Sequence, residues 1–423
     1  MQITRQSPVR QALFGGIGLL FLAGYLSLTT REFLAAHVSG QPALASLQRA
    51  ATLEPGNAYY QYTLGRYDLM VLQEPEAALQ FFRNAAALDP HKAAYWFDLS
   101  MTYQVLENTT EQTRALEKAI LADPRTPDIA WQAANLYWVE GKPEKALQEF
   151  RVVAENDPYR VSAALERCWR IRPDVDALLS NVVPRRSDVY SAFLEFLISK
   201  DEAAAAARVW TQMTQLQQPI ETRPVFDYVR YLIGRREVDP ARLVWNQAAS
   251  PAGLSAYQPS AENLVVNGDF SLTVLNSGFD WLYESIPGVS LAVDPTESHS
   301  GHQSLAIAFD SAGIEDAGIR QLVPVEPNTD YEFSAYFKSE NIEGAGGPRL
   351  VAQDRFSGAT FFTSEELKGE EFWKQAAGKF TTGPDTKLLV LRVQRVPPGN
   401  AIRGRLWLDD LRLIKRPLRE GGE

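Results

Sequence analysis

Three segments of equal length decide the fold of this chain: PEAALQFFRNAAALDP at residues 75–90, TTEQTRALEKAILADP at 109–124 and PEKALQEFRVVAENDP at 143–158. Each segment ends in Asp-Pro, and the three pairs follow one another at intervals of 34 residues. Proline can begin a helix but cannot continue one, so each pair marks the end of a helix. An interval of this length is typical of a helix-turn-helix repeat. The sequence therefore predicts three such units, at residues 57–90, 91–124 and 125–158.

Small and bulky side chains recur at fixed positions inside these units. Spacings of four and then three residues place each set on one helical face. The sets are Ala43, Leu47 and Ala50; Ala78, Phe82 and Ala85; Gln112, Leu116 and Ala119; and Ala146, Phe150 and Val153. The pattern resembles the tetratricopeptide repeat over residues 40–160, although Gln112 replaces a small residue and Gly65 is displaced by one position. This resemblance implies an α-helical solenoid that binds a protein partner.

Helical patterning continues after the clear repeats, from residue 161 to residue 249. Apolar stripes and helix-starting residues predict further helices here, near Asp188, Pro224 and Pro240. Stacked repeats contact only their neighbours and wind into a superhelix with a concave binding face. Among the aromatic residues of the first helices, Tyr59 and Trp131 are our candidates for partner binding. The alternative is that they belong to the core, as most aromatics at helical spacing do.

The N-terminal residues 11–30 carry no charge and are predominantly apolar. About 20 such residues span the ~30 Å hydrocarbon layer as a helix. Because Arg5 and Arg10 precede them, we expect residues 1–10 in the cytoplasm and the bulk of the chain outside it. In a Gram-negative bacterium that location is the periplasm. We predict a retained transmembrane signal anchor, with a cleaved signal peptide and a non-membrane helix as the alternatives.

The overall composition argues against several classes of function. A formal charge of −10 and an isoelectric point near 5.2 disfavour a nucleic-acid partner, because proteins that bind nucleic acid carry a basic face. Cys168 is the only cysteine, so no disulfide forms within the chain. One cysteine and four histidines are few ligands for a transition-metal site, and we predict no cofactor of that kind.

A turn-rich linker at residues 250–262 separates the helices from a region of short alternating runs. Runs of this kind, broken by turns such as Asn267-Gly268, predict the strands of an antiparallel β-sandwich at residues 263–417, followed by a tail at 418–423. The predicted strands are 264–266, 289–293, 304–309, 319–325, 331–338, 349–354, 376–381, 387–393 and 405–414.

Four stretches of this second region carry a second resemblance. They are NLVVNGDF at 263–270, SHSGHQSLA at 298–306, PVEPNTDYEFSAYFK at 324–338 and LWLDDLRL at 406–413. In this order and spacing they resemble the jelly rolls of carbohydrate-binding modules of the family 4 and 9 type, which have a galactose-binding-like fold. The resemblance implies a jelly-roll sandwich that binds a glycan or docks on a second partner.

A structural calcium ion is a further implication of this resemblance. In the family, an acidic residue after the opening Phe and an aspartate near the last strand hold the ion. Here Ser271 follows Phe270, whereas Asp409 and Asp410 are present. Calcium needs six to eight oxygen ligands, and carbonyls of the 298–301 loop are further candidates. The alternative is that both aspartates only accept hydrogen bonds from nearby backbone amides.

Sugar binding needs aromatic platforms and polar side chains on one sheet face. The candidates are Trp281, Tyr283, Gln353, Arg355, Trp373, Arg392 and Gln394. Arg392 and Gln394 alternate with apolar residues and so share a face of their strand, as do Gln353 and Arg355 on theirs. A solvated sheet face explains the polar residues equally well, and either tryptophan has an alternative place in the core.

Two hypotheses about function follow. The first is a membrane-anchored, extracytoplasmic scaffold without enzymatic activity, acting in envelope or exopolysaccharide assembly, whose repeats bind a protein and whose sandwich binds a glycan or second partner. The second is a glycan hydrolase or lyase on the jelly roll, which needs two carboxylates roughly 5–10 Å apart. Glu284, Asp354, Glu365 and Glu366 are present, but none lies in a known catalytic motif. The sequence therefore favours the scaffold.

Overall fold

The computed structural model describes residues 8–39, 44–369 and 371–416 of the chain. They divide into two compact units, one ending at Pro184 and one beginning at Arg185. The described residues do not include most of the predicted cytoplasmic segment, with Arg5, or the predicted tail at 418–423.

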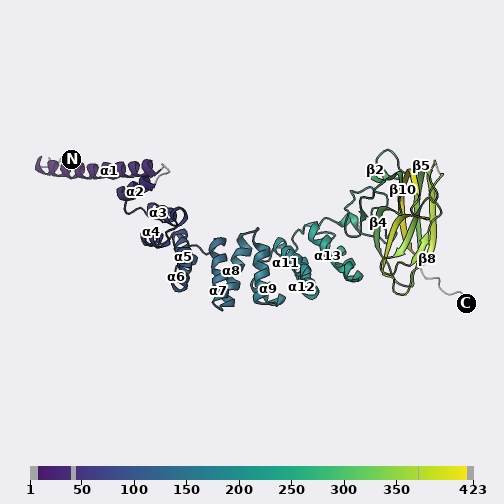
Figure 1. Ribbon diagram of the computed structural model, residues 1–423, viewed down its shortest axis with the longest axis horizontal. Helices are drawn as coiled ribbons and strands as arrows, with labels where there is room; N and C mark the ends of the chain where they lie inside the picture. The colour runs from purple at the N-terminus through teal and green to yellow at the C-terminus, as the bar shows by residue number, and fades with distance from the viewer. Residues whose placement is uncertain (1–7, 40–43, 370, 417–423) are drawn as a thin grey trace, which may run out of the picture. The chain divides into compact units, whose positions relative to one another are not determined.

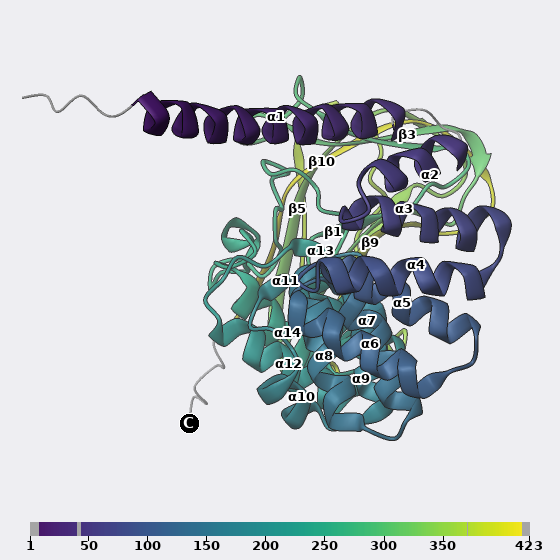
Figure 2. The same cartoon turned by 90° about the vertical axis from the view of Figure 1, so that its left-hand side faces the viewer.

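In the first unit, the regular elements of the described residues are all helical. Its elements are α1 (Pro8–Ser39), α2 (Leu44–Leu53), α3 (Ala58–Tyr67), the π-helical turn η1 (Asp68–Leu72), α4 (Pro75–Leu88), α5 (Ala93–Val105), α6 (Thr109–Ala122), α7 (Pro127–Val139), α8 (Pro143–Asn156), α9 (Val161–Ile171) and α10 (Val175–Asn181). Figure 1 and Figure 2 show consecutive helices of this unit side by side, with α5 against α6 and α7 against α8. The predicted helical solenoid is confirmed.

The repeated face forms the contact between paired helices. Phe82 on α4 and Phe150 on α8 are fully buried, and the small residues Ala78 and Ala146 are buried beside them. A Cβ atom on Gly65 would lie 2.9 Å from the Phe82 ring, so α3 approaches α4 at a position where only glycine fits. The small positions of the motif therefore set how closely the helices pack.

The irregular first repeat has a structural cause. Glu54-Pro55 precedes Asp89-Pro90 by 35 residues, one more than the regular interval. The helix after Gly65 takes up the extra residue in η1, because a π-helical turn accommodates one residue more than an α-helical turn. Gln73 ends this turn in the left-handed conformation, with φ of 57°.

Helix α1 extends beyond the predicted span into the repeats. Within Leu13–Ser39 an 18-residue window has a mean hydropathy of 1.6, and the segment is long and apolar enough to cross a membrane by length and composition alone. Near the end of α1, Ala35 is fully buried in a cluster with Ala50, Tyr60 and Leu64. The Nε of Arg31 donates a hydrogen bond to the carbonyl of Leu53 at 3.0 Å. The last turns of α1 therefore pair with α2.

The second unit begins with four helices and ends with the sandwich. Its elements are α11 (Ser187–Ser199), α12 (Ala203–Gln215), α13 (Thr222–Gly234), α14 (Val238–Ala248), the 3-10 turn η2 (Ser255–Tyr257), β1 (Trp281–Tyr283), β2 (Val289–Asp294), β3 (Ser304–Gly313), β4 (Asp316–Pro324), β5 (Asp330–Glu343), β6 (Pro348–Asp354), β7 (Thr360–Thr363), β8 (Lys374–Thr381), β9 (Leu388–Arg395) and β10 (Ala401–Lys415). The compact unit that holds the sandwich thus includes the last helices.

The strands form two antiparallel sheets of five strands each (Figure 1). We call the sheet with the order β1-β4-β9-β6-β7 sheet A and the sheet with the order β2-β3-β10-β5-β8 sheet B. Alternate residues of both sheets fill one core, for example Leu391 and Val393 from sheet A and Phe333 and Leu406 from sheet B. The predicted β-sandwich is confirmed.

The strand predictions missed in two respects. Residues 264–266 form no strand; the amide of Leu264 instead donates a single hydrogen bond to the carbonyl of Leu413 at 2.9 Å. The short edge strands β1 and β7 were not predicted, because three or four residues give too little alternation to recognise.

An ordered connection joins α14 to the sandwich. The indole Nε1 of Trp245 donates to the carbonyl of Tyr257 at 2.9 Å, and its ring meets Phe279 edge-on at 5.8 Å. At Gly278 the φ angle is +63°, and a Cβ atom would lie 2.0 Å from the Trp245 ring. Segment 250–262, predicted as a linker, thus runs beside a packed contact between helix and sandwich.

Candidate functional site

The first helices of successive repeats line a groove of about 950 Å³. Its lining residues are Leu69, Met70, Gln73, Pro75, Phe97, Asp98, Met101, Val105, Asp128, Trp131, Gln132, Arg160 and Ala163. Most are apolar, and Met70 and Val105 are among the exposed large hydrophobic residues of the chain. An apolar groove of this size can accept a peptide or helix of another protein.

Trp131 lies half-buried in this groove. Its ring meets the buried Phe150 edge-on at 5.6 Å, and the guanidinium groups of Arg160 and Arg167 lie 5.9 and 5.2 Å from its centre. These contacts fix the orientation of the indole. Tyr59, the other predicted partner-binding residue, is 58% exposed but does not line the groove. Only Trp131 belongs to it.

The groove also contains acidic groups. Burial raises the pKa of Asp98, although a hydrogen bond with Tyr62 and the charge of Arg66 oppose that rise. Burial, with the charge of Asp98, raises the pKa of Tyr62 to about 12. Asp128 pairs with Arg160 at 2.7 Å. A basic group of a partner placed beside Asp98 would compensate its poorly solvated carboxylate.

Three predicted glycan-binding residues meet on the outer face of sheet A. Arg392 donates one hydrogen bond from its guanidinium to the side-chain oxygen of Gln353 and forms an ion pair with Asp316 at 3.4 Å. With its amide oxygen turned toward the guanidinium, Gln394 accepts from Arg392 at 2.8 Å. Because Leu391 and Val393 alternate with Arg392 and Gln394 and lie in the core, these polar side chains face away from it.

Tyr283 and Arg355 lie in an adjoining cavity of about 400 Å³. The other walls of this cavity are formed by strands β1 and β4, by the 276–278 turn and by helix α13. In the ladder between β4 and β9, Arg320 of this cavity lies directly opposite Arg392, which joins the cavity to the polar row. The wall formed by α13 could not be predicted from the sequence, because its residues lie more than 120 positions before Arg355.

The two predicted tryptophans have different environments. Trp281 is 2% exposed, its Nε1 donates to the carbonyl of Asn267 at 3.0 Å, and its ring stacks on Phe270 at 5.2 Å. Its ring is therefore not available as a sugar platform, and Trp281 belongs to the core. Trp373 precedes β8 of sheet B and meets His299 edge-on at 6.0 Å, so it is not part of the face of sheet A that carries Arg392.

Asp409, a candidate for the calcium site that the resemblance implied, accepts hydrogen bonds from three backbone amides. The backbone amides of His299 and Ser300 donate to Oδ2 of Asp409, at 2.7 and 2.9 Å respectively. The backbone amide of Asp410 donates to Oδ1 of Asp409 at 2.7 Å. Both carboxylate oxygens of Asp409 thus accept hydrogen bonds from the backbone. The arrangement therefore fits an aspartate that binds backbone amides, which was the alternative prediction.

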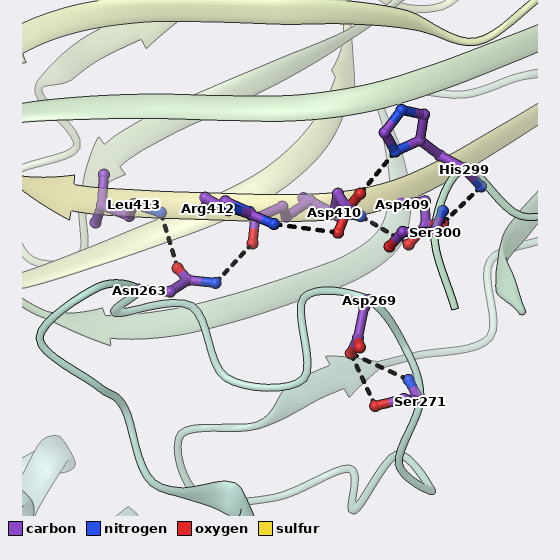
Figure 3. A network of polar contacts seen from close by, with 10 residues as sticks. Asn263, Asp269, Ser271, His299, Ser300, Asp409, Asp410, Arg412 and Leu413 are labelled. Atoms are coloured by element: carbon purple, nitrogen blue, oxygen red, sulfur yellow. Dashed lines mark hydrogen bonds and ion pairs between the residues drawn. The ribbon is translucent and has the colours of Figure 1, made fainter. Parts of the chain in front are cut away.

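Asp410 has a different partner. Its Oδ2 lies 2.6 Å from Nδ1 of His299, and Figure 3 shows this carboxylate directed at the imidazole ring. Burial acts to raise the pKa of Asp410, but hydrogen bonds from His299 and Ser300 outweigh it and lower the pKa. Asp269 turns to Ser271 instead (Figure 3). Among the described residues, no group of three or more His, Cys, Asp or Glu could hold a metal ion.

His299 lies in the loop before β3 and contacts two residues that are distant in the sequence. The structure stacks its ring on Tyr336 at 3.5 Å and pairs it with Asp410, which lies 111 residues later in the chain. No local signal indicates such a contact, because it depends on the pairing of β10 with the loop before β3.

A buried carboxyl group lies in the turn beside the cavity. Asp280 is fully buried and accepts from the amide of Leu275 at 2.7 Å, while its Oδ1 has no hydrogen-bond partner among the described residues. Burial raises the pKa of Asp280 to about 6. The folded state therefore binds this proton more tightly than the unfolded chain does. The free energy of unfolding of the protein therefore falls as the pH rises from about 4 through about 6.

We expect Asp280→Asn to stabilise the second unit at pH 7.5 by as much as about 3 kcal/mol, because the variant removes a buried charge. The advantage should shrink markedly at pH 4.5, where the wild-type carboxyl is protonated. Urea unfolding at the two pH values measures it, and Asp385→Asn at an exposed position is the control. An equal effect of Asp280→Asn at both pH values would contradict the assignment.

Comparison with known proteins gives matches to structures only. No family model and no curated protein sequence matches the chain. A family 4 carbohydrate-binding module matches with 13% identity and a TM-score of 0.28, over 36% of this chain and 99% of the other. A xylan-binding family 22 module from Paenibacillus barcinonensis matches with 17% identity and a TM-score of 0.27, over 37% of this chain and 96% of its own.

The helical part has matches of its own. A tetratricopeptide repeat protein from Parabacteroides merdae matches with 15% identity and a TM-score of 0.30, over 53% of this chain and 93% of the other. The chain thus resembles tetratricopeptide repeat proteins in its helices and carbohydrate-binding modules in its sandwich.

Proposed function

We propose that this chain is a membrane-anchored, extracytoplasmic scaffold without enzymatic activity. Its helical repeats bind a protein partner, its sandwich binds a glycan, and together they act in the assembly of an envelope or exported polysaccharide. The apolar groove around Trp131 carries the proposal. It is formed by first helices of neighbouring repeats and exposes large hydrophobic side chains such as Met70 and Val105.

Two features of the sandwich support a binding role for it. Arg392, Gln353 and Gln394 form one network on the outer face of sheet A, where their polar atoms can exchange hydrogen bonds with sugar hydroxyls. Three of the four candidate carboxylates have partners: Glu284 pairs with Arg320, and Glu366 pairs with Arg349. Asp354 accepts from the amides of Phe356 and Ser357. This arrangement favours binding over acid-base catalysis.

The anchor follows from α1. Its apolar part has the length and composition of a membrane span, and Arg10 precedes the predicted span whereas Arg31 and Glu32 follow it with cancelling charges. The positive-inside rule then places both binding surfaces outside the cytoplasm.

Site-specific photocrosslinking tests the groove. We expect a benzoylphenylalanine residue at Val105 to give a discrete crosslinked protein in intact cells of the native host. The same probe at Val139 is a matched control. Val139 lies 34 residues later, at the same position of the next repeat. Its side chain is 85% exposed, whereas that of Val105 is 61% exposed. Unlike Val105, it does not line the groove.

Trp131→Ala should lower the yield of the Val105 crosslink about tenfold, because an aromatic anchor in a groove contributes more than 1 kcal/mol to binding. Identical crosslinks from positions 105 and 139, unaffected by Trp131→Ala, would show that the groove is not the partner site.

A further inference from the structure

The cavity between α13 and sheet A has walls of mixed character. Val229 and Ile233 of α13 face Leu282 and Leu322 of the sheet, which gives the cavity apolar sides. Tyr283 lies at its edge and is 51% exposed. An apolar side together with an exposed aromatic ring suits the weakly polar face of a pyranose. The volume of about 400 Å³ is sufficient for a small ligand or one end of a chain.

The charges in this cavity are predominantly positive. Arg230, Arg320 and Arg355 line it, whereas Glu284 is the only carboxylate among the lining residues. Arg320 pairs with Glu284 at 3.1 Å, and Arg230 pairs with Asp227 at 2.9 Å. This excess of guanidinium groups contrasts with the net charge of −10 of the whole chain. The local field therefore favours an anion.

Arg355 has no counter-charge of its own. Its guanidinium makes no ion pair or hydrogen bond within the part of the chain that the structure describes, although its backbone amide donates to Leu388 at 2.9 Å. A guanidinium presents its N–H groups in a planar fork that matches a carboxylate at both oxygens. Arg355 is thus free to bind the carboxylate of a ligand.

The two walls are held in place by packing. Gly278 of the cavity lies against the Trp245 ring so closely that no side chain fits between them, and Asn276 accepts from the amide of Tyr283 at 2.8 Å. Lys387 of the sandwich also pairs with Asp239 of α14 at 2.6 Å. The site is therefore preorganised, which lowers the entropy cost of binding.

We propose that this cavity binds a carboxylate-bearing sugar, and that the glycan partner of the sandwich is an acidic, uronate-containing polysaccharide. Arg355 and Arg320 bind the carboxylate, and Tyr283 packs on the sugar ring. The next sugar of the chain reaches the row of Arg392, Gln353 and Gln394. This inference rests on the proposed glycan binding by the sandwich and specifies the class of glycan. It also makes α13 part of the binding site.

Calorimetric titration of the full chain in detergent micelles tests this proposal. The probes are hexasaccharides of galacturonate, of mannuronate and of hyaluronan, each compared with its carboxyl-reduced neutral counterpart. We expect at least one acidic probe to bind at least tenfold more tightly than its neutral form, with an affinity that falls as salt is added.

Arg355→Gln should weaken the binding of that acidic probe about tenfold, because a hydrogen-bonded ion pair is lost. It should leave the melting temperature unchanged and weaken binding of the neutral counterpart less than binding of the acidic probe. Arg403→Gln is the control: Arg403 is an exposed arginine of sheet B that pairs with Glu343 at 2.6 Å. It removes the same charge from the protein without touching the cavity, and we expect it to leave affinity unchanged.

Three results would overturn the inference. Equal binding of acidic and neutral probes, with no effect of Arg355→Gln, would leave glycan binding intact and refute the acidic class. Tight acidic binding that is insensitive to both Arg355→Gln and Arg320→Gln would place the anion elsewhere. If no acidic or neutral probe binds, the proposed glycan binding fails together with the inference.

Discussion

Trp281→Ala is expected to lower the free energy of unfolding of the second unit by about 3–5 kcal/mol. The indole is 2% exposed, stacks on Phe270 and donates a hydrogen bond to the carbonyl of Asn267. Its removal leaves a cavity at the centre of the sandwich and an unpaired buried carbonyl, and each of these costs free energy. Hydrogen exchange of the sandwich amides as a function of urea concentration measures the loss for this unit alone.

Phe372→Ala provides the comparison for Trp281→Ala. Phe372 is an aromatic residue of the same unit but is 82% exposed, so its truncation should change the free energy of unfolding by less than about 0.5 kcal/mol. Equal and small effects of the two substitutions would mean that Trp281 is not part of the core.

Phe150→Ala is expected to lower the stability of the first unit by about 3–5 kcal/mol, and Phe82→Ala should cost a similar amount. Both rings are fully buried between paired helices. Because repeats contact mainly their neighbours, the loss should appear in hydrogen exchange of the pair that contains the substitution and of the pairs beside it. Phe150 also meets Trp131 edge-on, so its loss should weaken partner binding in the groove.

Tyr159→Ala is a control for the repeats, since Tyr159 is 98% exposed just after α8. We expect no measurable change in the exchange of α7 and α8 in this variant. A neutral outcome for both Phe82→Ala and Phe150→Ala would show that the register of the repeats is wrong.

The helical repeats could be predicted in detail because their signals are local. The interval of 34 residues and the small residues around Phe82 and Phe150 fix which faces pack together, and the structure places those faces in the helix contacts. The sandwich strands were predicted from alternation in the same way. The short strands β1 and β7 escaped, because their place in sheet A depends on pairing with β4 and β6.

The candidate sites were less accessible to sequence reasoning. Arg392 and Gln394 were correctly placed together by their alternation with core residues. The environment of Trp281 depends on Phe270, and that of His299 on Asp410, and neither contact leaves a local pattern. The cavity at Arg355 includes Arg230 from a helix of a different region. Such sites become visible only when the fold brings distant segments together.

In the proposed anchor, the single helix α1 joins the apolar span to the turns that pack on α2. An α-helix turns about 100° and rises about 1.5 Å per residue. One residue inserted between Thr30 and Arg31 would therefore swing the packed end of α1, and the repeats docked on it, about a quarter of a revolution around the helix axis. In the proposed scaffold the groove would keep its affinity for a partner but would face a different direction around the helix axis. The number of residues between the proposed span and Arg31 thus determines the direction in which the groove faces.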